Sequence, residues 1–214
     1  MVDSFAVELS NVSKRFGKHW ALACLNYRLP AAHSLLLTGH NGSGKTTLLR
    51  LLASAVAPTL GQLRVLGMDV QKEAHGVRQH TALLSHASHH YEDLSAEQNL
   101  RLLARLLGKD ADIPGLLERV GLFARKQHPV RQFSAGMRKR LAIARLLLKG
   151  PRLALLDEPF GELDPAGIVS MENLIRQLKA QGTSLILATH LVEQGLSLTE
   201  ARLHLNQGRL EEAS

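Results

Sequence analysis

Short apolar runs, bounded by polar or turn residues, recur along the chain and indicate strands. Six runs carry this pattern: residues 6–9, 25–29, 34–38, 62–66, 153–156 and 184–188. Residues 34–38, 153–156 and 184–188 are dominated by Leu, Ile and Ala, which is typical of strands covered on both faces in a parallel sheet. We therefore expect a parallel core sheet.

Apolar residues with a helical period lie between these runs. Residues 95–107 place four leucines on one helical face, and Ser95 is suited to cap the N-terminus of this helix. The patterns of residues 46–53, 113–120 and 135–148 also predict helices. No internal repeat is visible, so we predict one compact α/β domain with an inserted helical portion.

Composition limits the class of protein. With 214 residues and 45% hydrophobic content, the chain can bury one domain well but not two large ones. Cys24 is the only cysteine, which excludes an internal disulfide and suits a reducing compartment. We expect no signal peptide, because Asp3 and Glu8 interrupt the N-terminus and no apolar region follows a basic start. We expect no membrane span, because no run of about 18 uncharged apolar residues occurs.

The formal net charge of +7 favours phosphate-rich partners or an anionic membrane surface. However, an aromatic content of 4% leaves few platforms on which single-stranded nucleic acid could stack. We therefore interpret most of this charge as solvated surface.

Residues 39–47 fit the phosphate-binding pattern G-x-x-x-x-G-K-[ST] at every required position. The segment consists of Gly39, His40, Asn41, Gly42, Ser43, Gly44, Lys45, Thr46 and Thr47. Its glycines let backbone N–H groups point at phosphate oxygens, Lys45 reaches the β- and γ-phosphates, and Thr46 is placed to bind Mg²⁺. The segment follows a predicted strand and opens a predicted helix, which favours a nucleoside triphosphate site over a glycine-rich turn.

Polar residues also end two later strands. Asp157 and Glu158 follow residues 153–156, as in the acidic element of phosphate-loop ATPases. Asp157 would hold Mg²⁺ through water, and Glu158 would polarise the water that attacks the γ-phosphate. An ordinary strand-end turn is the alternative. His190 follows residues 184–188, where a lone histidine is usually structural, but its place in this series favours a catalytic role.

The chain resembles the ATP-binding subunits of ABC transporters. Residues 133–141 are similar to the family signature L-S-G-G-Q, and the resemblance implies that Ser134 and Gly136 contact the γ-phosphate bound by a partner subunit. It implies further that Asp164 links the two halves of a dimer and that Phe16 stacks on adenine. Packing in the core is the alternative for Phe16.

This resemblance runs essentially end to end and implies the fold. It implies an α/β phosphate-loop NTPase (ABC-type ATPase) with a parallel core sheet, a small antiparallel β-subdomain and an inserted helical subdomain. Residues 1–214 would form a single ABC ATP-binding domain. Its nucleotide-binding core would comprise residues 1–85 and 146–214, and its helical subdomain residues 86–145.

The resemblance also implies a mechanism. An ATP-dependent homodimer would enclose two ATP molecules with Mg²⁺, each between the phosphate loop of one copy and the signature of the other. Lys45 and the signature helix would offset charge on the transferring phosphoryl group, while Glu158 and His190 position the water. Integral membrane permease subunits on separate chains would be the partners, and no direct nucleic-acid contact is expected. The expected location is cytoplasmic, peripheral on the inner face of the cell membrane.

Three residues depart from the family pattern. His86 occupies the loop that normally carries a glutamine touching Mg²⁺, and a neutral His86 ring would accept a bond from metal-bound water. Met137 replaces the glutamine of the signature, and Gly161 stands where a small hydroxyl residue is common. These departures concern hydrolysis rather than nucleotide binding.

Several functional alternatives remain open. His86, the short length and the ending at residues 189–196 resemble the ATPase subunit of the haem exporter in bacterial cytochrome c maturation, so we expect the chain to energise a transporter of this haem-exporter type. ATPases of drug, lipid or polysaccharide exporters share much of this pattern. A soluble ABC ATPase acting on ribosomes or nucleic acid is less favoured, because two cassettes or a long coiled-coil insertion usually mark that class. A catalytically dead nucleotide sensor is disfavoured because Lys45, Asp157, Glu158 and His190 are all present.

A group of histidines offers another interpretation. It comprises His80, His86, His89 and His90, and the last three have spacing that suits one helical face. Such a group could bind Zn²⁺ or contact haem, but no cysteine or carboxylate completes a ligand set. We favour a polar, solvated loop.

Overall fold

The structure is a computed structural model that describes residues 4–85 and 90–212. Packing of the backbone divides the chain into two compact units. The first contains residues 1–83, 151–159 and 172–214, and the second contains residues 84–150 and 160–171.

A six-stranded sheet with the order β10-β9-β3-β8-β7-β6 is the centre of the first unit. Its strands are β3 (Ser34–Thr38), β6 (Thr81–Leu84), β7 (Leu153–Asp157), β8 (Ser184–Ala188), β9 (Ala201–Asn206) and β10 (Arg209–Glu212). Strand β3 pairs in parallel with β8 and β9, and β7 pairs in parallel with β8. Every residue of β3, β7 and β8 is buried, which confirms the prediction of a buried parallel core.

A second, four-stranded sheet of the first unit has the order β2-β1-β4-β5 and is antiparallel. Its strands are β1 (Phe5–Phe16), β2 (His19–Pro30), β4 (Leu60–Val65) and β5 (Met68–Asp69). β1 is much longer than the predicted run 6–9, because register shifts interrupt its alternation and Asn11 has a φ of 51°. Such bulges hide a strand from a period-two analysis.

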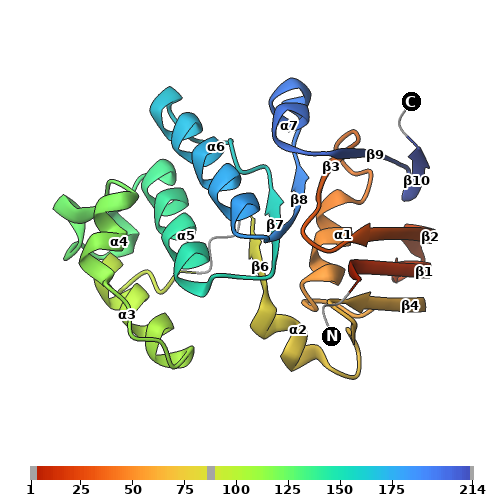
Figure 1. The fold of residues 1–214 in the computed structure, drawn as a ribbon, viewed down its shortest axis with the longest axis horizontal. Helices are drawn as coiled ribbons and strands as arrows, with labels where there is room; N and C mark the ends of the chain where they lie inside the picture. Colours follow the sequence, from red (N-terminus) through yellow and green to blue (C-terminus); the bar gives the residue numbers. More distant parts are fainter. Residues whose placement is uncertain (1–3, 86–89, 213–214) are drawn as a thin grey trace. The chain divides into compact units, whose positions relative to one another are not determined.

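Helix α1 (Lys45–Leu52) contacts β2 of the antiparallel sheet and β7 and β8 of the parallel sheet, so it lies between the two (Figure 1). Its four leucines are buried there. The other helices with residues in this unit are α2 (Ala74–His80), α6 (Pro165–Ala180), which runs on from the second unit, and α7 (Val192–Leu198). This packing fixes the start of α1 beside the end of β3.

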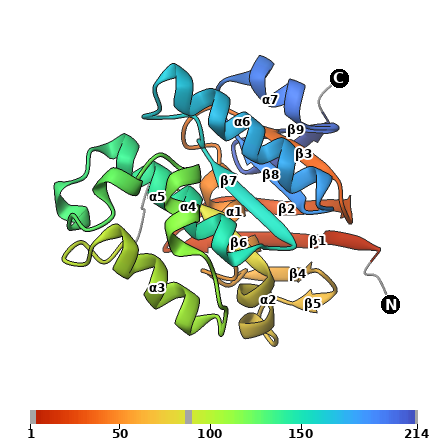
Figure 2. The same cartoon turned by 60° about the vertical axis from the view of Figure 1, so that its left-hand side comes forward.

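The second unit is helical. It contains α3 (Ala96–Leu106), α4 (Ile113–Arg119), α5 (Ala135–Lys149) and two 3-10 turns, η1 (Phe123–Arg125) and η2 (Val130–Gln132). The helices α3, α4 and α5 pack on one another (Figure 2) around an apolar core that includes Leu100, Leu117 and Leu141. Within residues 4–85 and 90–212, no helix is both long and apolar enough to cross a membrane.

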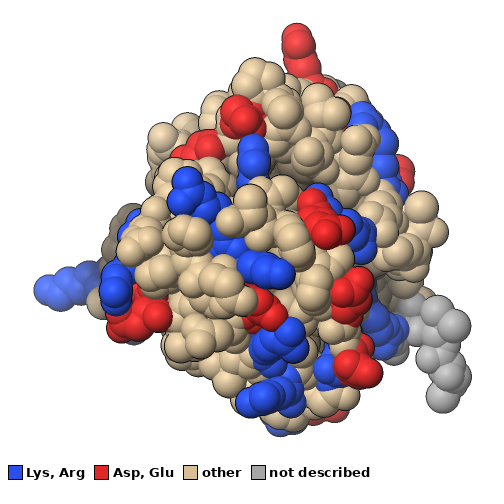
Figure 3. Space-filling view, turned by 90° about the vertical axis from the view of Figure 1, so that its left-hand side faces the viewer, with Lys and Arg blue, Asp and Glu red and all other residues tan. Residues whose placement is uncertain are grey.

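Charged side chains of both signs lie on the face shown in Figure 3. In the second unit, Arg101 forms an ion pair with Glu97, and Arg131 forms one with Asp93. Part of the basic surface is therefore neutralised locally.

Ser95 caps α3, as the sequence predicts. Its Oγ accepts a hydrogen bond from the Gln98 N–H (3.2 Å), and its own N–H donates to the Gln98 side chain (2.9 Å). We expect Ser95→Ala to lower the free energy of unfolding by about 1 kcal/mol, because the variant removes the hydroxyl that accepts the hydrogen bond from the Gln98 N–H. Urea unfolding measures the change. Ser170→Ala, at an exposed position within α6, is the control, and equal losses in both variants would contradict the capping role.

Candidate functional site

The phosphate-binding segment lies between the end of β3 and the start of α1. Gly39 has a φ of 147°, and a Cβ at this position would lie 2.2 Å from the backbone oxygen of Leu205. Only glycine fits there. Ser43 is buried, and its hydroxyl has no hydrogen-bond partner in the part of the chain that is described. A tight backbone cradle with a free buried hydroxyl suits the acceptor oxygens of a phosphate group.

The ammonium of Lys45 folds back over this loop. Its Nζ donates hydrogen bonds to the carbonyl oxygens of Gly39 (2.6 Å) and His40 (3.1 Å). His40 and Asn41 are exposed on the loop, and Thr47 is half-buried in the first turn of α1. The loop therefore holds a positive charge at its centre, where the phosphates of a nucleotide would need it.

Thr46 and Asp157 meet beside the loop. The Thr46 hydroxyl donates to Oδ2 of Asp157 at 2.7 Å, and Asp157 is buried at the end of β7. Hydroxyl and carboxylate oxygens are the hard ligands that Mg²⁺ prefers. This pair of oxygens fits a site at which Mg²⁺ keeps several waters and is completed by phosphate oxygens.

Glu158 and His190 form a second contact. The Glu158 carboxylate Oε2 lies 2.9 Å from Nδ1 of His190 and 3.3 Å from its backbone N–H. Because a carboxylate only accepts, Nδ1 carries the proton in this contact. Glu158 has a φ of 47°, and its N–H donates to the carbonyl of Ala188, which turns the chain sharply after β7. The side chain of a potential general base is thereby oriented by a histidine.

These residues share one edge of the parallel sheet. Strands β3, β8 and β7 are neighbours in the sheet order, and the candidate residues follow their carboxyl ends. Open parallel sheets bind ligands at this edge. The structure thus brings together four sequence-predicted functional residues that are far apart along the chain: Lys45, Asp157, Glu158 and His190.

Phe16 ends β1 and is 49% exposed, so the alternative of core packing for this ring is wrong. The ammonium of Lys14 lies 4.9 Å from the centre of the Phe16 ring. An exposed aromatic ring beside a cation is available to stack on a base.

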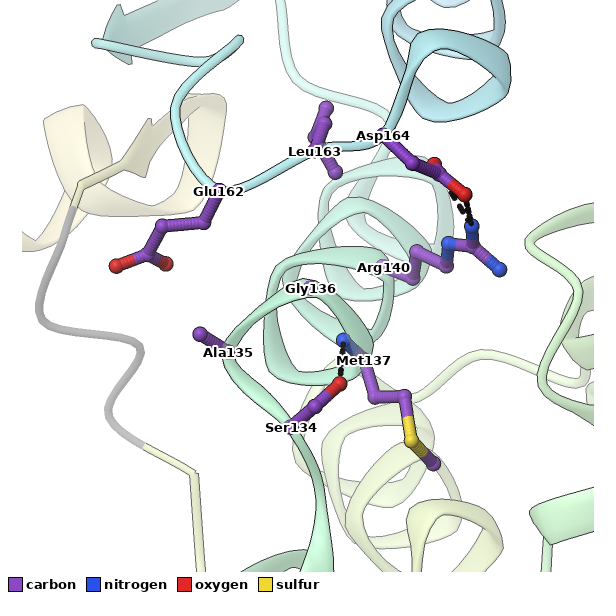
Figure 4. A pocket seen from close by; sticks show the side chains of 8 residues that line it. All are labelled: Ser134, Ala135, Gly136, Met137, Arg140, Glu162, Leu163 and Asp164. Carbon is purple, nitrogen blue, oxygen red and sulfur yellow. Dashed lines mark hydrogen bonds and ion pairs between the residues drawn. The ribbon is translucent and has the colours of Figure 1, made fainter.

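The signature residues form a separate site within the second unit. Ser134 is the N-cap of α5, and its Oγ accepts a hydrogen bond from the Met137 N–H at 3.2 Å (Figure 4). Ser134 and Gly136 line an open pocket of about 570 Å³, and Asp164 lines the same pocket. A helix N-terminus that opens into a pocket attracts anions.

Arg140 is a pocket residue to which the sequence assigned no role. Its Nη2 donates to Oδ1 (3.1 Å) and Oδ2 (3.3 Å) of Asp164 (Figure 4). The Gly167 N–H also donates to Oδ1 at 2.9 Å. The hydrogen bond from Gly167 has the largest effect on the Asp164 carboxyl, and the hydrogen bond from Arg140 has a smaller one. Together they hold the pKa of this carboxyl below its ordinary value.

We expect Arg140→Gln to raise the pKa of Asp164 but to leave it below the ordinary value, because the Gly167 bond remains. A carboxyl with a lowered pKa stabilises the fold above its unfolded-state pKa and loses this contribution as pH falls through its folded-state pKa. In the variant this contribution is therefore smaller, and its loss is complete at a higher pH than in the wild type. Carboxyl-carbon NMR titration measures the shift, with Arg101→Gln as control, and an unchanged Asp164 pKa would exclude the contribution of Arg140.

The predicted metal-site residue His86 lies outside the described residues, as does His89. His90 is described: its Nε2 lies 2.9 Å from the carbonyl oxygen of Arg138, and its Nδ1 lies 3.3 Å from Nη1 of Arg145. No group of three or more His, Cys, Asp or Glu side chains suited to a metal ion occurs within residues 4–85 and 90–212.

Comparisons with known proteins show the family to which the chain belongs. Residues 22–161 match the family model described as ABC transporter. The chain is 36% identical over 210 residues to the daunorubicin resistance ATP-binding protein DrrA3 of Streptomyces coeruleorubidus, covering 96% of this chain and 66% of that protein. It is 30% identical over 205 residues to the lantibiotic transport ATP-binding protein SrtF of Streptococcus pyogenes, covering 95% of this chain and 88% of that protein.

A solved structure of an ATP-binding subunit of an ABC transporter has the same fold. It superposes with a TM-score of 0.89 at 26% identity, covering 96% of this chain and 88% of the other. In ABC transporters, ATP hydrolysis by such domains is coupled to transport. The family match, the relatives and the shared fold lead to one conclusion: the chain belongs to the ABC transporter family, as an ATP-binding subunit with an ABC-type ATPase domain.

Proposed function

We propose that the chain binds and hydrolyses MgATP to drive a membrane exporter. The observation that carries this proposal is the set of contacts at the edge of the parallel sheet. There, Lys45 lies over the phosphate loop, Thr46 bonds Asp157, and His190 holds Glu158. This set supplies a phosphate-binding cation, a pair of metal-binding oxygens and an oriented base.

Each residue has a role in this proposal. Lys45 binds the β- and γ-phosphates, and Thr46 and Asp157 hold Mg²⁺, which when bound would neutralise charge on the phosphates. Glu158 accepts a proton from the attacking water, while His190 keeps the carboxylate in place. Phe16 stacks on adenine. The other residues of the segment, from Gly39 to Thr47, enclose the phosphates with their backbone N–H groups.

We also propose that the complete site is shared between two copies of the chain. The pocket of Ser134, Gly136 and Asp164 lies in the second unit, whereas the phosphate loop lies in the first. In a homodimer, the pocket of one copy would contact the γ-phosphate bound by the other. The helix N-terminus at Ser134 favours such an anion. Residues 86–145, the predicted helical subdomain, would carry this signature.

The exported cargo, in this proposal, belongs to the drug or peptide-antibiotic class. The relatives reported above are named for daunorubicin resistance and lantibiotic transport, and neither name supports the haem exporter that the sequence predicts. Permease subunits on separate chains would carry the cargo. The chain would then work in the cytoplasm, peripherally on the inner face of the cell membrane.

Purification from native membranes in mild detergent tests this function. We expect a multi-span permease to accompany the chain, and cargo-stimulated ATPase activity from the purified complex. Recovery of haem-handling proteins would replace the cargo proposal with the haem exporter. Recovery of ribosomes or nucleic acid, with no membrane protein, would contradict a role in transport.

A further inference from the structure

We propose that the turn between β9 and β10, at Gly208, positions the phosphate loop for nucleotide binding. This inference rests on the proposed function. Strand β9 pairs with β3, and the last pair joins His204 to Thr38, the residue directly before the phosphate loop. The hairpin therefore begins its contact with the loop at the point where the loop leaves the sheet.

The hairpin then contacts the loop at three places. A Cβ added at Gly39 would lie 2.2 Å from the backbone oxygen of Leu205, and one added at Gly44 would lie 3.3 Å from a methyl of Leu205, so the hairpin passes close to the loop at both glycines. The Gly208 N–H donates a hydrogen bond to the carbonyl of Ser43 at 3.0 Å. The third contact is directional, and it falls on the residue just before Gly44 and Lys45.

The bond to Ser43 sets the orientation of a peptide group. In a planar trans peptide, the C=O and the following N–H point in opposite directions. Because Gly208 holds the Ser43 carbonyl, the Gly44 N–H points to the side away from the hairpin. Phosphate loops bind through such inward N–H groups. Gly208 therefore acts through Ser43 as a positioning residue and does not touch the nucleotide.

The turn is itself fixed on its other side. The Gly208 carbonyl accepts a hydrogen bond from the Ala23 N–H of β2 at 2.8 Å. Gly208 has a φ of +78°, and a Cβ here would lie 2.7 Å from the backbone oxygen of Ala21. Since the atoms that this Cβ would meet belong to the backbone of Ala21 and Leu22, they cannot move aside as a flexible side chain would. An added side chain must therefore displace the turn itself.

Gly208→Ala and Gly182→Ala form a matched pair. Gly182 also has a φ of +78°, but a Cβ there would meet no atom within 4 Å. Both variants carry similar backbone strain, and only Gly208→Ala displaces the contact with Ser43. We expect Gly208→Ala to raise KM for MgATP about tenfold, with kcat changed less than about twofold, and Gly182→Ala to change neither.

A raised KM with an unchanged kcat distinguishes a positioning role from a loss of stability. A variant that is only destabilised contains fewer active molecules, so its apparent kcat falls while its KM stays the same. An unchanged KM in Gly208→Ala, or an equal rise in Gly182→Ala, would overturn the inference.

Hydrogen exchange of the wild-type chain gives a test that needs no variant: adding ADP should slow exchange at the Gly208 amide together with the loop amides. Protection of the loop alone would overturn the inference. A wild-type chain that binds neither ATP nor ADP would overturn the proposed function with it.

Discussion

Glu158→Gln should lower kcat for ATP hydrolysis about 100- to 1,000-fold while leaving ATP affinity nearly unchanged. The amide is almost the same size as the carboxylate, and its oxygen can still accept the bond from His190. It cannot accept a proton from water. The variant therefore removes the base and keeps the geometry around it, and a phosphate-release assay with an ATP titration separates the two effects.

Glu118→Gln is the matched control, because Glu118 is exposed on α4 in the second unit. We expect its kcat to equal that of the wild type. Wild-type turnover in Glu158→Gln would show that another group accepts the proton. A large loss of ATP affinity in the same variant would instead show that Glu158 is a binding residue.

Lys45→Ala should weaken ATP binding itself, by about 10- to 100-fold in Kd. The ammonium would make charge-assisted hydrogen bonds to phosphate oxygens, each of which contributes about 1.5–3 kcal/mol. In the structure this ammonium is held above the loop by the carbonyls of Gly39 and His40, so its removal also loosens the loop.

Isothermal titration calorimetry with ATP measures this loss. Lys72→Ala removes an exposed lysine outside the site and serves as the control. A Kd within twofold of the wild type for Lys45→Ala would contradict the assignment of this loop as the phosphate site.

The residues at the sheet edge could be predicted because their signals are local. Residues 34–38, 153–156 and 184–188 are uninterrupted apolar runs, and the structure buries all of β3, β7 and β8. Functional side chains follow directly after such strands, so a short stretch of sequence contains both the strand and its chemistry. The N-cap at Ser95 was visible for the same reason.

Other features depend on contacts that no local pattern records. β9 buries only Leu203 and Leu205, so its apolar signal is short, and register shifts interrupt the alternation of β1. The pairing of Arg140 with Asp164 depends on the packing of α5 in the second unit, which no local sequence pattern records. The bond from Gly208 to Ser43 joins opposite ends of the chain, and its existence depends on the register of β9 on β3.

The central claim is a site shared between two copies, and mixing two inactive variants tests it most directly. Lys45→Ala disables the phosphate loop, while Gly136→Asp places a negative charge in the signature pocket and leaves the Ser134 cap in place. Each variant alone should hydrolyse almost no ATP. A one-to-one mixture should recover about a quarter of wild-type turnover, because half of the randomly formed dimers then carry one intact site of two. A mixture no more active than either variant alone would contradict the shared site.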